Sequence, residues 1–232
     1  MSASFNPPSF ARYQRPALLV GVVGFVLLLV GMVFSREQFF HSYIIGFTFW
    51  TGIAVGSLAL LMLQHLTGGG WGFVIRRVLE AATRTLPLMA VLFIPIILGS
   101  HWLYKWTRPE VLETEPIVKF KHGFLNLPFF STRAVLYFAI WMVFAYFLNK
   151  WSLLQDRTAE RRYTKNMRLL SGPGMVFLIF SVSFAAIDWY MSLEPEWSST
   201  IYGFIFVAAW SLSALAFVIA VMAVLSKEEP MK

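Results

Sequence analysis

The sequence contains no cysteine and few charged residues. Of its 232 residues, 13% are Asp, Glu, Lys or Arg, whereas a soluble domain carries about 25%. Without cysteine the chain cannot form a disulfide, hold a thiolate-ligated iron–sulfur cluster, or attach haem through a C-x-x-C-H motif. A metal redox centre within this chain would therefore depend on its 4 histidines.

Hydrophobic residues make up 58% of the chain, and aromatic residues make up 17%. A membrane-spanning helix needs about 20 apolar residues, and six segments approach or exceed that length. They are predicted at about Ala17–Phe34, Tyr43–Leu66, Thr85–Trp102, Thr132–Asn149, Pro173–Leu193 and Thr200–Leu225. The sequence thus predicts an all-α polytopic membrane protein, with residues 1–232 forming a single membrane domain.

The net charge of +7 comes from basic residues in the segments between the apolar runs. Most of the 19 Lys and Arg fall before the first span, in residues 67–84 and 150–172, or after the sixth span. Fewer, Arg133 among them, fall on the opposite side. Because cytoplasmic loops carry the excess of Lys and Arg, both termini are expected in the cytoplasm. We interpret these charges as topology signals that face lipid head groups, and not as a nucleic-acid site.

Proline and glycine predict the local shape of two spans. Pro95 lacks the amide that would bond to the carbonyl of Val91, which favours a bend near the middle of the third span. Gly52 and Gly56 are four residues apart in the second span. This spacing predicts a face on which another helix approaches closely.

The stretch "SFAAIDWYMSLEPEW" places Asp188 near the end of the fifth span. With a rise of about 1.5 Å per residue from Pro173, the carboxylate would lie some 22 Å into a hydrocarbon core about 30 Å thick. Ionisable residues at such depth usually face the bundle interior or a water-filled cavity, and they are functional candidates. His41, at the start of the second span, and His101, at the end of the third, are expected to converge there.

Ser181 and Ser192 share the helical face of Asp188, because they lie seven residues before it and four residues after it. A water chain along this face would form a candidate proton path. The alternative is that Asp188 only accepts hydrogen bonds near the interface, beside an aromatic belt. His41 and His101 would then simply be solvated.

A second set of charges lies in Trp71–Pro87, where Arg76, Glu80 and Arg84 are spaced four apart, opposite apolar residues. This spacing predicts an interfacial amphipathic helix that contacts phospholipid. The alternative is that Glu80 and Arg84, with His65 and Gln64, gate a cytoplasmic proton entrance. The loop Leu103–Phe130, on the outer side, is predicted to have no core of its own and to lie against a partner or the membrane surface.

Two segments carry a resemblance to a known family. They are "HSYIIGFTFWTGIAVGSLALLMLQHLTGGGWGFVIRRVLEAATRTLPLMAVLFIPI" and "AAIDWYMSLEPEWSSTIYG". Together they resemble the NrfD-like membrane subunits, specifically the second such subunit of the quinol:cytochrome c oxidoreductase called alternative complex III. The resemblance extends from about His41 to the sixth span. It implies a bacterial inner-membrane protein in which the second to fifth spans form a four-helix bundle.

The resemblance also implies the partners and the electron donor of the complex. The partners would be an iron–sulfur subunit, multihaem cytochrome c subunits and a sister NrfD-like membrane subunit, and the donor would be a quinol. Quinol oxidation is attributed mainly to the sister subunit, so we expect no catalytic residue and no redox centre in this chain. Family members usually have a second bundle after the first. This sequence is therefore expected to be either the N-terminal part of such a subunit or a shortened member of the family.

Four functions follow for the same chain. The first is a subunit of the quinol-oxidising complex in which Asp188, His101, His41, Glu80, Ser181 and His65 contribute to proton movement. The second is a purely structural membrane anchor for the redox subunits. The third is a b-type cytochrome with haem between the two outer histidines. The fourth, a secondary transporter, is disfavoured because no inverted repeat is detectable.

Overall fold

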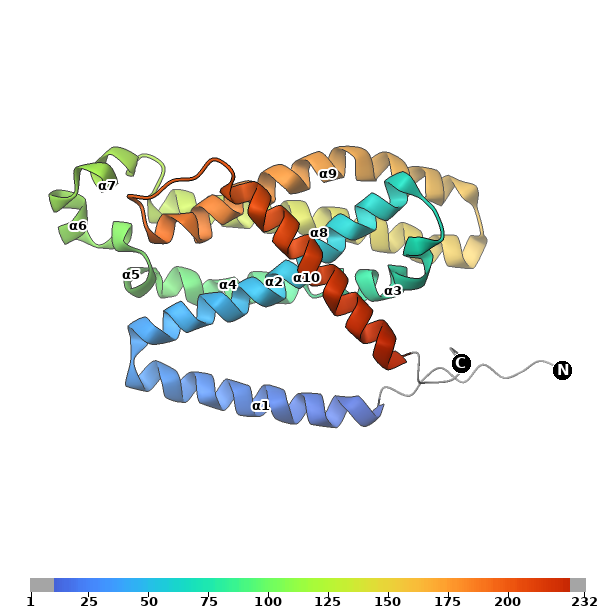
Figure 1. Ribbon diagram of the computed structural model, residues 1–232, viewed down its shortest axis with the longest axis horizontal. Coiled ribbons are helices and arrows are strands. Elements are labelled where there is room, and N and C mark those ends of the chain that lie inside the picture. The colour runs from blue at the N-terminus through green and yellow to red at the C-terminus, as the bar shows by residue number, and fades with distance from the viewer. Residues whose placement is uncertain (1–10, 226–232) are drawn as a thin grey trace.

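The computed structural model describes residues 11–225, and the described part of the chain is helical, with no strand (Figure 1). The helices are α1 (Ala11–Phe34), α2 (Arg36–Thr67), α3 (Trp71–Thr83), α4 (Leu86–Leu98), α5 (Ser100–Leu103), η1 (Lys105–Thr107), α6 (Pro109–Thr114), α7 (Pro116–Lys121), α8 (Leu127–Thr158), α9 (Arg161–Trp189), η2 (Met191–Leu193) and α10 (Tyr202–Leu225). Five described helices are long and apolar enough to cross a membrane, and the bent pair of α3 and α4 makes a sixth candidate. The predicted class, an all-α polytopic membrane protein, is confirmed. The outermost parts of the predicted domain, 1–10 and 226–232, lie outside the described residues.

Four helices, α1 among them, are longer than the spans predicted from hydropathy. α2 begins at Arg36, α8 ends at Thr158 and α9 begins at Arg161. The basic segment expected between the fourth and fifth spans is therefore almost wholly helical. Its turn is short, and Ala159 adopts a left-handed conformation there, with φ of 53°. Hydropathy marks the apolar length of a helix, whereas backbone hydrogen bonding continues into the polar residues beyond it.

The third span departs most from its prediction. In place of one helix over Thr85–Trp102, α4 has 13 residues, about 20 Å of helix. It follows α3 with a bend of 40°. The break has a local cause, because Pro87 lacks the amide that would bond to the carbonyl of Thr83. Pro87 is well placed at the start of the new helix instead.

Pro95 does not break the helix where the sequence predicted a bend. It lies inside α4, which continues to Leu98. The carbonyl of Leu92, one residue after the carbonyl that Pro95 deprives of its partner, accepts a hydrogen bond of 2.7 Å from the Tyr43 hydroxyl. A side chain of α2 thus donates to the α4 backbone beside the carbonyl that Pro95 affects.

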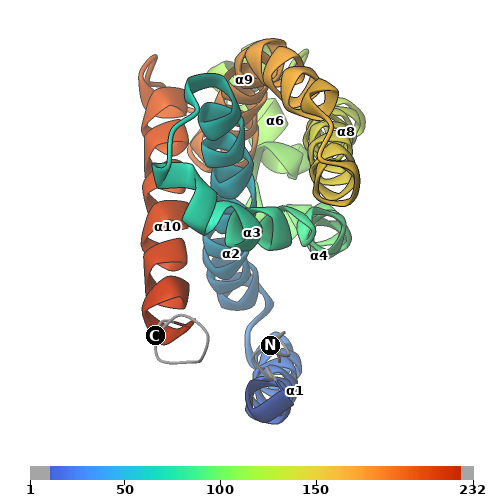
Figure 2. The ribbon, with the colours of Figure 1, turned by 90° about the vertical axis from the view of Figure 1, so that its right-hand side faces the viewer.

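α2 runs through the middle of the molecule, with α10 on one side and α4 and α8 on the other, while α9 packs against α2, α8 and α10 (Figures 1 and 2). Side chains of α2, α4 and α8 pack around Trp189, whose ring centroid lies 4.6 Å from that of Phe93 and 5.6 Å from that of Phe138. α10 packs along both α2 and α9. α1 is different, because its apolar span is not buried and it stands apart from the bundle (Figure 2).

The small-residue face predicted on α2 is confirmed, and it receives α10. A Cβ added at Gly56 would overlap the backbone carbonyl of Trp210, and a Cβ at Gly52 would lie 2.6 Å from the Trp210 ring. The Trp210 carbonyl that an added Cβ at Gly56 would meet belongs to the backbone, so it cannot rotate away as a side chain can. The contact between α2 and α10 therefore requires glycine at position 56.

We expect Gly56→Ala to lower the free energy of unfolding by about 1–3 kcal/mol, the usual cost of overpacking. Gly46→Ala is the matched control, because Gly46 lies on the same helix with no atom within 4 Å of an added Cβ. Unfolding of both variants in mixed detergent micelles measures the difference. Equal stability of the two would contradict the close approach of α10.

The loop after α5, predicted to have no core of its own and to lie against a partner or the membrane surface, packs against the bundle of its own chain. Residues 103–126, which we call the loop end, form short helices that bury Tyr104, Trp106, Val118 and Leu125. The Tyr104 hydroxyl donates a 3.0 Å hydrogen bond to the carbonyl of Trp189. Burial raises the pKa of Tyr104 well above its ordinary value, so this donor stays protonated. The loop end therefore shares the core of the bundle and closes it at one end.

Candidate functional sites: two buried charge clusters

Asp188 is fully buried and forms an ion pair with Arg133 of α8. The Arg133 Nε atom lies 2.7 Å from Oδ2 of Asp188, and Nη2 lies 2.8 Å from Oδ1. Tyr137, one turn along α8 from Arg133, donates a further hydrogen bond of 2.7 Å to Oδ2. Both carboxylate oxygens are therefore occupied by donors from one neighbouring helix.

Arg133 has further partners besides Asp188: a backbone carbonyl and two aromatic rings. Its Nη1 donates to the carbonyl of Phe124 over 3.1 Å. The guanidinium carbon lies 3.9 Å from the ring centroid of Phe124 and 4.3 Å from that of Phe129. Bidentate pairing and aromatic stacking are the two interactions for which Arg is better suited than Lys. The arrangement fixes a buried charge pair between α8 and α9, beneath the loop end.

The predicted convergence of histidines on Asp188 is not found. His41 and His101 are both exposed, and neither forms a hydrogen bond with the carboxylate. His41 contacts the carbonyl of Glu37 on its own helix through Nδ1, at 2.9 Å. Position along a span indicates the depth of a residue, but depth does not fix the direction in which its side chain points.

The partner of Asp188 is not predicted from the sequence, because Arg133 stands at the edge of the predicted fourth span, among the loop charges. One pattern points to it. Arg133, Tyr137 and Trp141 are spaced four apart, so they share the face of α8 that is turned toward α9.

The two serines expected near Asp188 lie on its helix or just beyond it, but they do not form a chain of donors and acceptors with its carboxylate. Ser181 accepts a hydrogen bond of 2.8 Å from Trp141 Nε1 and donates to the carbonyl of Leu178. Ser192 donates to the backbone carbonyl of Asp188. An indole N–H can donate a proton in a hydrogen bond but cannot accept one. A proton therefore cannot pass from Tyr137 through Trp141 to Ser181 along side chains alone.

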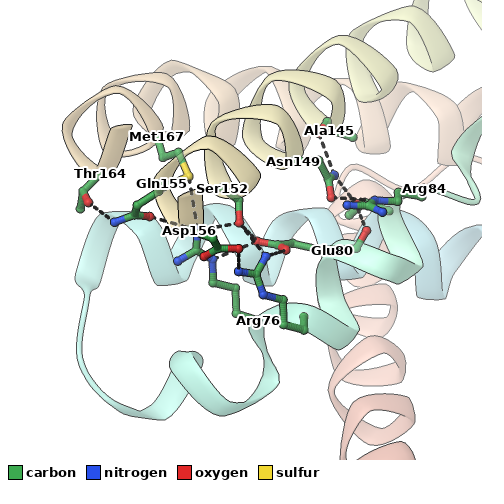
Figure 3. A network of polar contacts seen from close by, with 12 residues as sticks. Arg76, Glu80, Arg84, Ala145, Asn149, Ser152, Gln155, Asp156, Thr164 and Met167 are labelled. Carbon is green, nitrogen blue, oxygen red and sulfur yellow. Dashed lines mark hydrogen bonds and ion pairs between the residues drawn. The ribbon is translucent and has the colours of Figure 1, made fainter. Parts of the chain in front are cut away.

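A second cluster surrounds Glu80 at the opposite end of the bundle, which we call the basic end (residues 68–84 and 150–168). Only 3% of the Glu80 side chain is exposed. Arg76 Nε lies 2.9 Å from Oε1, and Arg77 Nη1 lies 2.6 Å from Oε2. Ser152 of α8 donates to Oε1 as well (Figure 3). This carboxylate, like that of Asp188, has a partner on each oxygen.

The two arginines also connect α3 to α8. Arg76 Nη2 donates to Ser152 Oγ over 2.7 Å and to Gln155 Oε1 over 3.3 Å (Figure 3). Arg77 Nη2 pairs with Asp156. The network ties the amphipathic helix to the bundle through its polar side chains.

The amphipathic helix predicted over Trp71–Pro87 exists as α3, but part of its polar face is turned into the protein. Glu80 is buried against α8, whereas the apolar residues Phe73 and Val74 are exposed. Glu80 therefore does not face the membrane surface, because ion pairs with Arg76 and Arg77 allow its carboxylate to be buried. The exposed apolar side of α3 agrees with contact to lipid.

His65 and Gln64 do not join Glu80 in a hydrogen-bonded gate. Among the described residues, His65 Nε2 and Gln64 Oε1 are buried atoms with no hydrogen-bond partner. Arg84 instead donates through Nε to Asn149 Oδ1 over 3.3 Å. Asn149 donates in turn to Thr83 Oγ1 over 2.9 Å.

α8 thus carries a buried charge cluster at each end, and apolar packing separates the two. Between them lie Ala145, Leu178 and Gly174, where a Cβ on Gly174 would meet Met62 and Phe144. Within residues 11–225, no three His, Asp or Glu side chains gather as a metal site would require. Chemically, the arrangement supplies fixed charges and helix-to-helix links.

No family model matches this chain, and no curated protein matches it either.

Proposed function

We propose that this chain is an integral membrane subunit of a bacterial quinol:cytochrome c oxidoreductase of the alternative complex III type. Its role would be to anchor the redox subunits, with its N-terminus in the cytoplasm. The proposal is supported by the two resembling segments, which cover α2 to α4 and the region from the end of α9 to the start of α10. The proposed partners are the iron–sulfur subunit, the multihaem cytochrome c subunits and the sister NrfD-like subunit.

The hydrogen bonds to both carboxylate oxygens of Asp188 are the observation that favours an anchoring role. A group that loads and releases protons needs one carboxylate oxygen that water or another carrier can reach. Arg133 and Tyr137 occupy both oxygens of Asp188, and Arg cannot give up its proton in a protein. The geometry therefore favours a charge pair that locks α8 to α9.

A proton path is the second candidate, and the position of the two clusters favours it. Asp188 and Glu80 contact opposite ends of α8, and Ser181 extends the first cluster toward the centre. Water entering the apolar middle would be required to join them. This candidate predicts proton movement that depends on Asp188 even when the fold is intact.

A groove lined by residues of α2, α3, α4 and α10 is suited to bind a quinol. The groove has a volume of about 710 Å³ and an almost wholly apolar wall that includes Leu88, Met89 and Phe217. Arg77 and Thr85 are the polar side chains that line it besides Trp50. The wall fits an isoprenoid tail, and the polar groups fit a quinone carbonyl.

Purification of the native protein from membranes in mild detergent tests the assignment. We expect haem-containing and iron–sulfur subunits to copurify, and the preparation to reduce cytochrome c when quinol is added. Dissociating this chain from its partners should remove the Soret absorption from it, whereas a b-type cytochrome would retain that absorption. A chain that purifies without redox subunits would contradict the proposal.

A further inference from the structure

A groove at the basic end combines an apolar wall with a positively charged rim. It lies between the α3–α4 corner and α8 and has a volume of about 530 Å³. Its apolar wall includes Leu86, Pro87, Met142 and Leu153. This volume is within the usual range of small-ligand sites, about 300–1,000 Å³.

The charges that line this groove all have one sign. They are Arg84, Lys150 and Arg157, and no acidic side chain is among the described residues that line it. Arg84 uses Nε to bond to Asn149, which leaves its two terminal nitrogens outside that bond (Figure 3). Lys150 and Arg157 are seven residues apart on α8, so they lie on the same face two turns apart. All three side chains belong to exposed residues.

We propose that this groove binds an anionic phospholipid, with the phosphate at the three basic side chains and an acyl chain along the apolar wall. Charge complementarity decides the class of ligand, because basic pockets between membrane helices attract anionic head groups. A zwitterionic lipid offers the same tail with no net charge. The proposal does not depend on the proposed function, since it concerns only the local surface of this chain.

Lipid binding to the full chain in detergent tests the proposal. The probes are phosphatidylglycerol and phosphatidylcholine with identical acyl chains, and native mass spectrometry measures the bound fraction of each. We expect phosphatidylglycerol to bind at least about tenfold more tightly to the unaltered chain. Arg84→Gln, Lys150→Gln and Arg157→Gln together should remove that preference.

The matched control removes three charges from the same end of the molecule outside the groove. Arg161, Lys165 and Arg168 of α9 are exposed and do not line the groove, so their replacement by Gln should leave the preference intact. Circular dichroism and gel filtration confirm that both triple variants are folded. Glycerol phosphate, which has the head-group charge without a tail, should not compete with the lipid.

Three results would overturn the proposal. One is an unaltered chain that shows no preference for phosphatidylglycerol, which would mean that the groove is occupied by a partner helix and not by an anionic lipid. Another is an equal loss of preference in the two triple variants, which would mean a diffuse charge effect. The third is full competition by glycerol phosphate, which would mean a site for free phosphate.

Discussion

Asp188→Asn is expected to lower the free energy of unfolding by about 3–5 kcal/mol, as is typical when one partner of a buried ion pair is removed. The cause is Arg133, which would remain buried with its positive charge unpaired. Asparagine can accept a hydrogen bond but cannot neutralise the guanidinium. Unfolding in mixed detergent micelles measures the loss.

Glu194→Gln is the matched control for this substitution. Glu194 pairs with Lys105 at 2.7 Å near the same end of the bundle, but 63% of its side chain is exposed. An exposed pair contributes about 0–1 kcal/mol. A similar small loss for both variants would contradict the view that the Asp188 pair fixes α8 to α9.

An uncharged replacement of the same cluster separates anchoring from proton movement. Arg133→Met, Tyr137→Phe and Asp188→Leu together leave no buried charge or hydroxyl unpaired, and such apolar replacements are often neutral or stabilising. We expect this variant to recover most of the stability lost in Asp188→Asn. If the cluster only anchors, the assembled complex keeps its quinol-driven turnover and proton release. An assembled complex that has lost proton release would establish the proton path instead.

Glu80→Gln is expected to cost about 3 kcal/mol, the lower end of the range for breaking a buried pair. Arg76 would lose its carboxylate partner while only 13% of its side chain is exposed. Arg77 is about half exposed and retains Asp156, which limits the cost. The same unfolding measurement applies, and proteolysis at α3 should become faster because the helix loses its link to α8.

Asp156→Asn provides the comparison on the same arginine. Asp156 pairs with Arg77, but 45% of its side chain is exposed, so its loss should cost no more than about 1 kcal/mol. A cost equal to that of Glu80→Gln would show that burial of Glu80 has no special importance. Helix content of both variants should stay unchanged.

The pattern of apolar and small residues predicted much of the architecture. Long apolar runs indicated the spans of α1, α2, α8, α9 and α10, because a lipid-facing helix must satisfy all its backbone groups internally. Gly52 and Gly56 predicted the close approach that α10 makes. The third span departs from its prediction at its end, since α4 stops at Leu98 before Gly99, whereas the bend before α4 lies beside Pro87 where the apolar run begins.

By itself the sequence determined the fold class and the presence of costly charges in or near the spans, because hydropathy and charge are properties of the chain and require no partner. Only the tertiary structure decided what those charges do. Asp188 and Arg133 are 55 residues apart, and Glu80 and Ser152 are 72 apart. Such pairs form only when α8 presents the correct face to α9 and α3. The rotation of a helix about its axis is set by the packing of all its neighbours, so a spacing such as that of Arg133, Tyr137 and Trp141 marks a face but does not identify its partner.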